Sequence, residues 1–165
     1  MSKSIDHVAG RIIEVEDVMS VKECDMFIQH TEKHGYKQSP PSGGGHGQTS
    51  RTGARTSQFY VEENEELAST LWNTVNKFVP KNLHNIKQTP YMSSSRKGDE
   101  YSAVGVSPHM RFYKYNKGQY ILKHDDYRMS RIRYDKKNEK YYKQMTFLTL
   151  LIYLNDGFQG GHTVF

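Results

Sequence analysis

Residues 20–35 repeat apolar positions at the spacing of an α-helix and carry a helix signal at each end. The sequence SVKECDMFIQHTEKHG opens with Ser20 and Glu23, which have the spacing of a capping box. It closes with Gly35, the residue type best suited to the left-handed conformation after a last helical turn. The segment therefore predicts a helix that starts after Ser20 and ends before Gly35.

A second helical pattern covers residues 62–79. Leu67, Leu71 and Val75 fall at helical spacing, and acidic residues crowd the first turn, where the helix dipole favours them. Pro80 cannot continue a helix and so ends it. We interpret the apolar stripe as core, and we expect both helices to pack on one outer face of a sheet.

Other stretches have the composition or the alternation of strands. They are residues 10–18, 55–60, 110–115, 119–126 and 145–154. Residues 116–118, Asn-Lys-Gly, predict a turn. The last strand segment, MTFLTLLIYL, is almost entirely apolar, so it should be buried on both faces. Residues 39–53 hold two Pro and several Gly and predict a surface loop.

Length and composition narrow the class of protein. The chain of 165 residues has the length of one domain, and 35% hydrophobic residues suffice for a core. It contains no apolar run of about 18 residues and no apolar leader, which predicts neither a membrane span nor secretion. Cys24 is the only cysteine, so no internal disulfide can form. A cytoplasmic setting fits these features.

Positive charge concentrates in residues 127–144, YRMSRIRYDKKNEKYYKQ, while the whole chain carries a net charge of +5. One interpretation is a solvated, charged hairpin that joins two strands. Another is a basic rim that attracts an acidic peptide or the phosphate backbone of a nucleic acid. Because no nucleic-acid-binding module accompanies the charge, nucleic acid is the less favoured partner.

His124 and Asp126 form an H-x-D motif on the strand expected at residues 119–126. Side chains two residues apart on a strand project to the same side. An imidazole beside a carboxylate supplies two of the three ligands in a 2-His-1-carboxylate facial triad, the usual holder of non-haem Fe(II). The motif therefore predicts part of an iron site.

His30 and His34 also have a spacing that can bind metal, four residues apart on a helix. No carboxylate accompanies them at motif spacing, so we interpret them as solvated histidines at the helix end.

The motifs around H-x-D follow one another in a recognisable order. Tyr115 and Gly118 precede it, an apolar strand ending in Tyr-Leu-Asn-Asp at 153–156 follows, and Gly-Gly-His-Thr at 160–163 comes last. This arrangement resembles the 2-oxoglutarate- and Fe(II)-dependent dioxygenases, in their prolyl 4-hydroxylase branch. His162 departs from the family pattern, in which Glu or another residue is common at this position.

The resemblance implies an α+β fold with a double-stranded β-helix, or jelly-roll, core braced by N-terminal helices. Residues 1–165 would form one domain, with 1–108 as support and 109–165 as the first half of the core. The family's distal His and its 2-oxoglutarate-clamping Lys or Arg lie on later strands. We therefore expect a core incomplete at its C-terminal end, either shortened or completed by another chain. His162 is a less favoured third iron ligand.

The resemblance also implies site residues and cofactors. His124 and Asp126 would bind Fe(II) and be catalytic, while Tyr115, Tyr153 and Thr163 would surround 2-oxoglutarate. The cosubstrate O2 would be consumed with 2-oxoglutarate to give succinate and CO2, and ascorbate is a further candidate cofactor.

The implied substrate is a prolyl or similar residue in a protein or peptide. Arg55 matches a region beside the family's peptide groove and is a candidate substrate contact, although a solvated strand arginine explains it as well. Three alternatives stay open: hydroxylation of a free amino acid or other small molecule, a non-catalytic half-barrel that binds a partner, and an oxygenase directed to nucleic acid.

Overall fold

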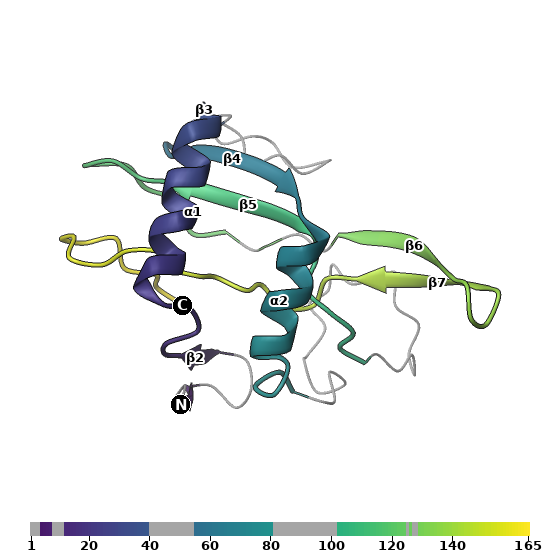
Figure 1. Ribbon diagram of the computed structural model, residues 1–165. Helices are drawn as coiled ribbons and strands as arrows, with labels where there is room; N and C mark the ends of the chain where they lie inside the picture. The colour runs from purple at the N-terminus through teal and green to yellow at the C-terminus, as the bar shows by residue number, and fades with distance from the viewer. Residues whose placement is uncertain (1–3, 8–11, 40–54, 81–101, 125, 127–128) are drawn as a thin grey trace. The chain divides into compact units, whose positions relative to one another are not determined.

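A computed structural model describes residues 4–7, 12–39, 55–80, 102–124, 126 and 129–165. Its elements, shown in Figure 1, are β1 (Ser4–Asp6), β2 (Ile13–Val15), α1 (Val21–His34), β3 (Lys37–Gln38), β4 (Gln58–Glu63), α2 (Glu65–Val75), β5 (His109–Lys114), β6 (Ser130–Asp135) and β7 (Lys140–Met145). The mixed α+β class is confirmed. The predicted loop at 39–53 lies, apart from Ser39, outside the described residues.

The chain divides into two compact units, one of residues 1–20 with 63–108 and one of residues 21–62 with 109–165. In the first unit, β1 and β2 pair antiparallel, with Ile5 opposite Glu14. The prediction of a single domain and the prediction that both helices share one face of a sheet stay predictions.

Helix α2 forms the apolar centre of the first unit. Ala68, Leu71 and Val75 are buried along one side, which confirms the predicted stripe at Leu71 and Val75, while Leu67 is only partly buried. The helix is shorter than predicted at both ends: residues 62–63 belong to β4 and the Asn64 side chain caps the first turn, and the last helical residue is Val75, well before Pro80. Its Oδ1 accepts a hydrogen bond of 2.8 Å from the Leu67 amide.

Helix α1 has the predicted bounds and packs on β4 and β5 in the second unit (Figure 1). The rings of Phe27 on α1 and Phe112 on β5 lie 6.1 Å apart between centroids. Gly35 ends the helix with φ of +81°, and its amide donates to the Thr31 carbonyl. Thr31 is fully buried and accepts a hydrogen bond of 2.7 Å from the Tyr36 hydroxyl.

The three-stranded sheet has the order β3-β4-β5. Strand β4 starts at Gln58, three residues later than predicted, and Arg55 makes only an isolated bridge to Ile121. The strand predicted over residues 119–126 is wrong for its described residues, 119–124 and 126, which form no strand apart from that bridge. The turn before it is confirmed, since the Gln119 amide donates to the Asn116 carbonyl and Gly118 has φ of +78°.

Strands β6 and β7 confirm the predicted charged hairpin. They pair antiparallel over their full length, from Ser130 opposite Met145 to Asp135 opposite Lys140. The Asp135 carboxylate accepts hydrogen bonds from the Lys137 amide and the Asn138 side-chain amide, which lower the pKa of Asp135.

The strand predicted over residues 145–154 is wrong. Strand β7 ends at Met145, and four of the apolar side chains that follow are 40–60% exposed: Leu148, Leu150, Leu151 and Tyr153. An apolar run becomes a central strand only when neighbouring strands satisfy its backbone, and none of the assigned strands pairs with it. The described residues form three small sheets and no closed barrel, so the jelly-roll stays a prediction.

Candidate functional site

The structure brings His124 and Asp126 together, although they do not lie on a strand. The His124 Nε2 atom lies 3.4 Å from Oδ1 of Asp126. Their side chains are 45% and 57% exposed, so solvent reaches both. The imidazole and the carboxylate thus lie close together as predicted, but the backbone that carries them is not a strand.

Hydrogen bonding defines which atoms of the pair are available. The His124 Nδ1 atom is 2.8 Å from the Leu122 carbonyl oxygen. A carbonyl only accepts, so Nδ1 carries the proton, and a neutral imidazole turns the Nε2 lone pair towards Asp126. Two acceptors that face each other suit a cation between them, either a proton or a metal ion.

The pair has the support that metal ligands usually receive. Backbone carbonyls and hydrogen-bonded carboxylates commonly orient the ligands of a metal ion. Here Leu122 orients the imidazole, and the Thr149 hydroxyl donates a 2.6 Å hydrogen bond to Oδ2 of Asp126. Neighbouring ligands about 2.1 Å from one ion lie roughly 3 Å apart, which the observed separation approaches. The residues present therefore fit a divalent ion.

Only two ligands of a triad are assembled in the described part of the chain. No group of three His, Cys, Asp or Glu side chains there is arranged to hold a metal ion. His162 accordingly does not complete the pair, and the third ligand stays a prediction.

Two of the residues expected beside 2-oxoglutarate meet each other. The Tyr153 hydroxyl and the Thr163 hydroxyl share a hydrogen bond across ten residues of sequence. Tyr115 directly follows β5 and is half-exposed. Their role at a cofactor stays a prediction.

Arg55 lies close to the segment that leads to the pair. Its guanidinium carbon is 4.2 Å from the centroid of the Tyr113 ring, a cation–π geometry, and its backbone bridges to Ile121. The bridge to Ile121 holds Arg55 beside a residue that precedes His124 by three positions. The expectation of a purely solvated arginine is therefore less well supported than a positioned one.

A second polar cluster was not predicted. The His30 Nε2 atom lies 2.8 Å from Glu62 Oε2, and the Tyr60 hydroxyl donates to the same oxygen at 3.0 Å. The expectation that His30 is solvated holds only in part, because its side chain is 40% exposed but also pairs with a carboxylate from β4, 32 residues along the chain. Partial burial raises the pKa of the Tyr60 phenol, and Glu62 raises it further.

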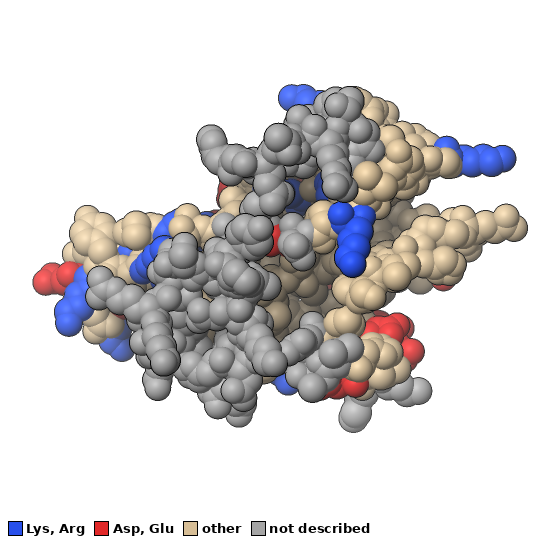
Figure 2. All heavy atoms as spheres, turned by 180° about the vertical axis from the view of Figure 1, so that it is seen from behind, with Lys and Arg blue, Asp and Glu red and all other residues tan. Residues whose placement is uncertain are grey.

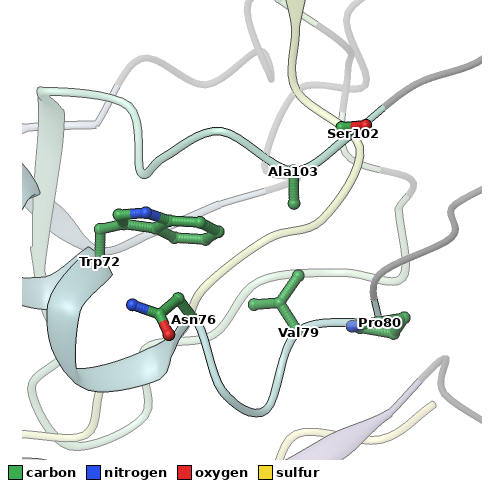
Figure 3. A pocket seen from close by; sticks show the side chains of 6 residues that line it. All are labelled: Trp72, Asn76, Val79, Pro80, Ser102 and Ala103. Carbon is green, nitrogen blue, oxygen red and sulfur yellow. The ribbon is translucent and has the colours of Figure 1, made fainter.

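Neither of two hollows is lined by His124 or Asp126. One of about 160 Å³ in the first unit is lined by Trp72, Asn76, Val79, Pro80, Ser102 and Ala103 (Figure 3). The indole faces Ala103 there, and no lining side chain can transfer a proton near neutral pH. The other, of about 330 Å³, is lined by residues that include His34, Lys37 and Tyr60.

Sequence reasoning found the two candidate ligands but missed the groups that orient them. Thr149 lies 23 residues from Asp126, within an apolar run that indicated only a strand. A contact at such a separation has no local sequence signal. The same is true of Glu62 beside His30.

Comparison with models of protein families, with curated proteins and with solved structures finds no match to this chain. Among the described residues, no helix is both long enough and apolar enough to cross a membrane.

Proposed function

We propose that this chain carries the iron-binding part of an Fe(II)- and 2-oxoglutarate-dependent dioxygenase that hydroxylates a prolyl or similar residue in a protein or peptide. The observation that supports this most directly is the 3.4 Å approach of His124 Nε2 to Asp126 Oδ1, with the second polar atom of each side chain already hydrogen-bonded. The order of motifs around the pair supports the same reaction class.

The residues of the chain divide the work between binding and orientation. His124 and Asp126 would hold the ion, while Leu122 and Thr149 fix the direction of their lone pairs. Bound there with 2-oxoglutarate, ferrous iron would activate O2, which is the oxidant for hydroxylation of a C–H bond, with succinate and CO2 as coproducts. Tyr153 and Thr163 present joined hydroxyls for a carboxylate of the 2-oxo acid.

Metal binding by the full chain tests the first requirement of the proposal, that His124 binds iron. We expect Fe(II), added without oxygen and followed by calorimetry, to bind wild type and to bind His124→Ala at least about tenfold more weakly. His7→Ala is a matched control, because His7 also pairs with an exposed carboxylate, Glu14, at 2.8 Å. It should bind like wild type.

Turnover is the second readout. In a protein whose core is complete, succinate release from 2-oxoglutarate should need Fe(II) and should be lost in His124→Ala and Asp126→Ala. Equal iron affinity in wild type and His124→Ala would refute the proposal. Iron binding without succinate release would instead favour the non-catalytic binding module.

A further inference from the structure

The β6–β7 ribbon, residues 130–145, carries different chemistry on its two faces. Residues directly opposite in an antiparallel pair share a face, and successive residues alternate. Ile132 and Tyr134 therefore share one face with Tyr141 and Lys143. Ile132, Tyr134 and Tyr141 are 64%, 49% and 75% exposed, so this apolar face is open to solvent.

The other face presents a row of arginines. Arg131 and Arg133 share it with Gln144 and Tyr142. The Nε atoms of both arginines donate to the Gln144 side-chain oxygen, at 3.2 and 3.4 Å. These bonds restrict both side chains before any partner arrives, which lowers the entropy cost of binding an anion.

The ribbon as a whole is strongly cationic. It contains six cations, Arg131, Arg133, Lys136, Lys137, Lys140 and Lys143, against the two anions Asp135 and Glu139, an excess of four positive charges. Figure 2 shows blue Lys and Arg side chains interleaved with tan ones at the left, where the ribbon lies. Like charge disfavours edge-to-edge pairing with a second copy of the ribbon, and it favours an acidic partner.

The ribbon has two strands, so within the described residues β6 pairs with β7 on one side only. The outer edge of a strand offers backbone N–H and C=O groups to an extended peptide, which is the basis of recognition by strand addition. The alternation along β6 would then give such a peptide a register.

The base of the ribbon adjoins the His124–Asp126 pair. Beyond the last strand pair, the Thr146 amide donates to the Met129 carbonyl and the Met129 amide donates to the Thr146 hydroxyl, both at 2.9 Å. Three residues further, Thr149 bonds to Asp126. The two chain segments are thus in contact at Met129 with Thr146 and again at Asp126 with Thr149.

We propose that the outer edge of β6 binds an extended segment of the protein substrate in which acidic and apolar residues alternate. The acidic side chains lie over Arg131 and Arg133, and the apolar ones over Ile132 and Tyr134. The bound segment lies along a ribbon whose base adjoins Asp126. This inference rests on the proposed function, because it assigns the substrate class of that same site.

The first test is direct binding to the full chain without iron or 2-oxoglutarate. The probe is a fluorescent peptide of alternating Glu and Val, long enough to span β6. A peptide of equal composition, with Glu in one block and Val in another, should bind about tenfold more weakly, because it loses the register. An alternating Lys and Val peptide should not bind.

Variants separate the strand edge from overall charge. Arg131→Glu with Arg133→Glu should weaken binding of the alternating peptide by about tenfold or more. The matched control, Lys136→Glu with Lys137→Glu, makes the same charge change in the turn and should weaken it by less than about threefold. Equal losses in the two double variants would overturn the proposal.

A backbone test on the wild-type chain does not depend on how the variants fold. Two versions of the peptide are compared, one N-methylated at the odd-numbered amides and one at the even-numbered amides. One version should lose binding and the other should bind nearly as before, because only alternate amides face a neighbouring strand. Loss in neither version overturns strand addition. Tighter binding of a single-stranded oligonucleotide than of the alternating peptide also overturns the proposal, in favour of nucleic acid.

The outcomes separate this inference from the proposed function. If the peptides bind as expected but the protein shows no iron-dependent succinate release, the proposed dioxygenase function is rejected and the peptide-binding edge of β6 is retained. Succinate release together with indifference to the peptides would do the reverse.

Discussion

At the scale of single residues, the site depends on hydrogen bonds that no motif contains. Asp126 is fixed by Thr149, and His124 by the carbonyl of Leu122. Each bond occupies the polar atom that faces away from the partner side chain. The remaining atoms, Nε2 and Oδ1, are therefore directed towards one another, which is the property that makes the pair a candidate for a cation.

Thr149→Val should weaken metal binding without removing a ligand. Valine keeps the size of threonine but cannot donate, so the Asp126 carboxylate is free to rotate. We expect the Fe(II) affinity of the full chain to fall by about tenfold, as is usual for groups that orient ligands. Thr74→Val, which removes a similar hydroxyl from α2, is the control and should leave the affinity unchanged. Identical affinities for wild type and Thr149→Val would contradict the assigned role.

Tyr60 gives a prediction for alkaline stability. Burial and Glu62 raise the pKa of this phenol above its usual value of 10.0 in the folded chain. The folded state then holds the phenolic proton more tightly than the unfolded state, so its contribution is fully present below pH 10.0 and is lost as pH rises through the folded pKa. Urea unfolding of wild type should therefore show a stability loss between pH 10 and the folded pKa that Tyr60→Phe lacks. Parallel pH profiles for the two proteins would rule this out.

At the scale of elements, the junction of α1 with β3 depends on a buried hydroxyl. Thr31 Oγ1 donates to the Phe27 carbonyl at 2.9 Å and accepts from Tyr36, so its hydrogen-bonding capacity is used in both directions. The bond to Tyr36 joins the helix to the residue just before the first strand of the sheet.

Thr31→Val should cost about 1–3 kcal/mol of unfolding free energy, because the Tyr36 hydroxyl loses its acceptor in a partly buried position. Tyr36→Phe removes the donor as well. The double variant should therefore be less unstable than the sum of the single variants, by about 1 kcal/mol, in a double-mutant cycle measured by urea unfolding. Additive losses would show that the two hydroxyls are not coupled.

The two helices show which sequence signals were sufficient to predict where a helix begins and ends. Helix α1 was predicted to the residue at both ends, because Gly35 and the segment's apolar spacing act locally. The start of α2 was placed too early, because the β4 strand extends to Glu63 and Asn64 then caps the helix. Both signals were present in the sequence, but the acidic run before the helix suited a first turn equally well.

The wrong predictions concern strands, because a strand depends on partners that are distant in the sequence. The segment 145–154 has the composition of a central strand, yet a strand exists only where another strand pairs with it. The H-x-D motif correctly predicted that the His124 and Asp126 side chains lie close together, although the strand itself is absent. Side chains two residues apart can approach each other in several backbone conformations, so the contact formed without the strand from which it was predicted.

At the scale of the whole molecule, the apolar side chains are unevenly covered. The buried hydrophobic side chains among the described residues, Ala68, Leu71 and Val75, all belong to α2. By contrast, residues 146–165 expose a series of large apolar side chains: Leu148, Leu150, Leu151, Tyr153, Phe158, Val164 and Phe165. Exposed apolar side chains gathered in one segment favour an interaction site or a liability to associate.

We therefore expect this 165-residue chain, on its own, to bind the dye ANS and to self-associate at micromolar concentration. Leu151→Lys with Phe165→Lys should lower both dye fluorescence and sedimentation coefficient, since a charge on an exposed position opposes association without removing a packed side chain. Lys136→Ala with Lys137→Ala, which alters the β6–β7 turn and no apolar side chain, should lower neither. A monomeric, dye-free wild type would mean that residues 146–165 are covered by other parts of the chain. The jelly-roll proposal would then have to place these residues in a core that this chain closes by itself.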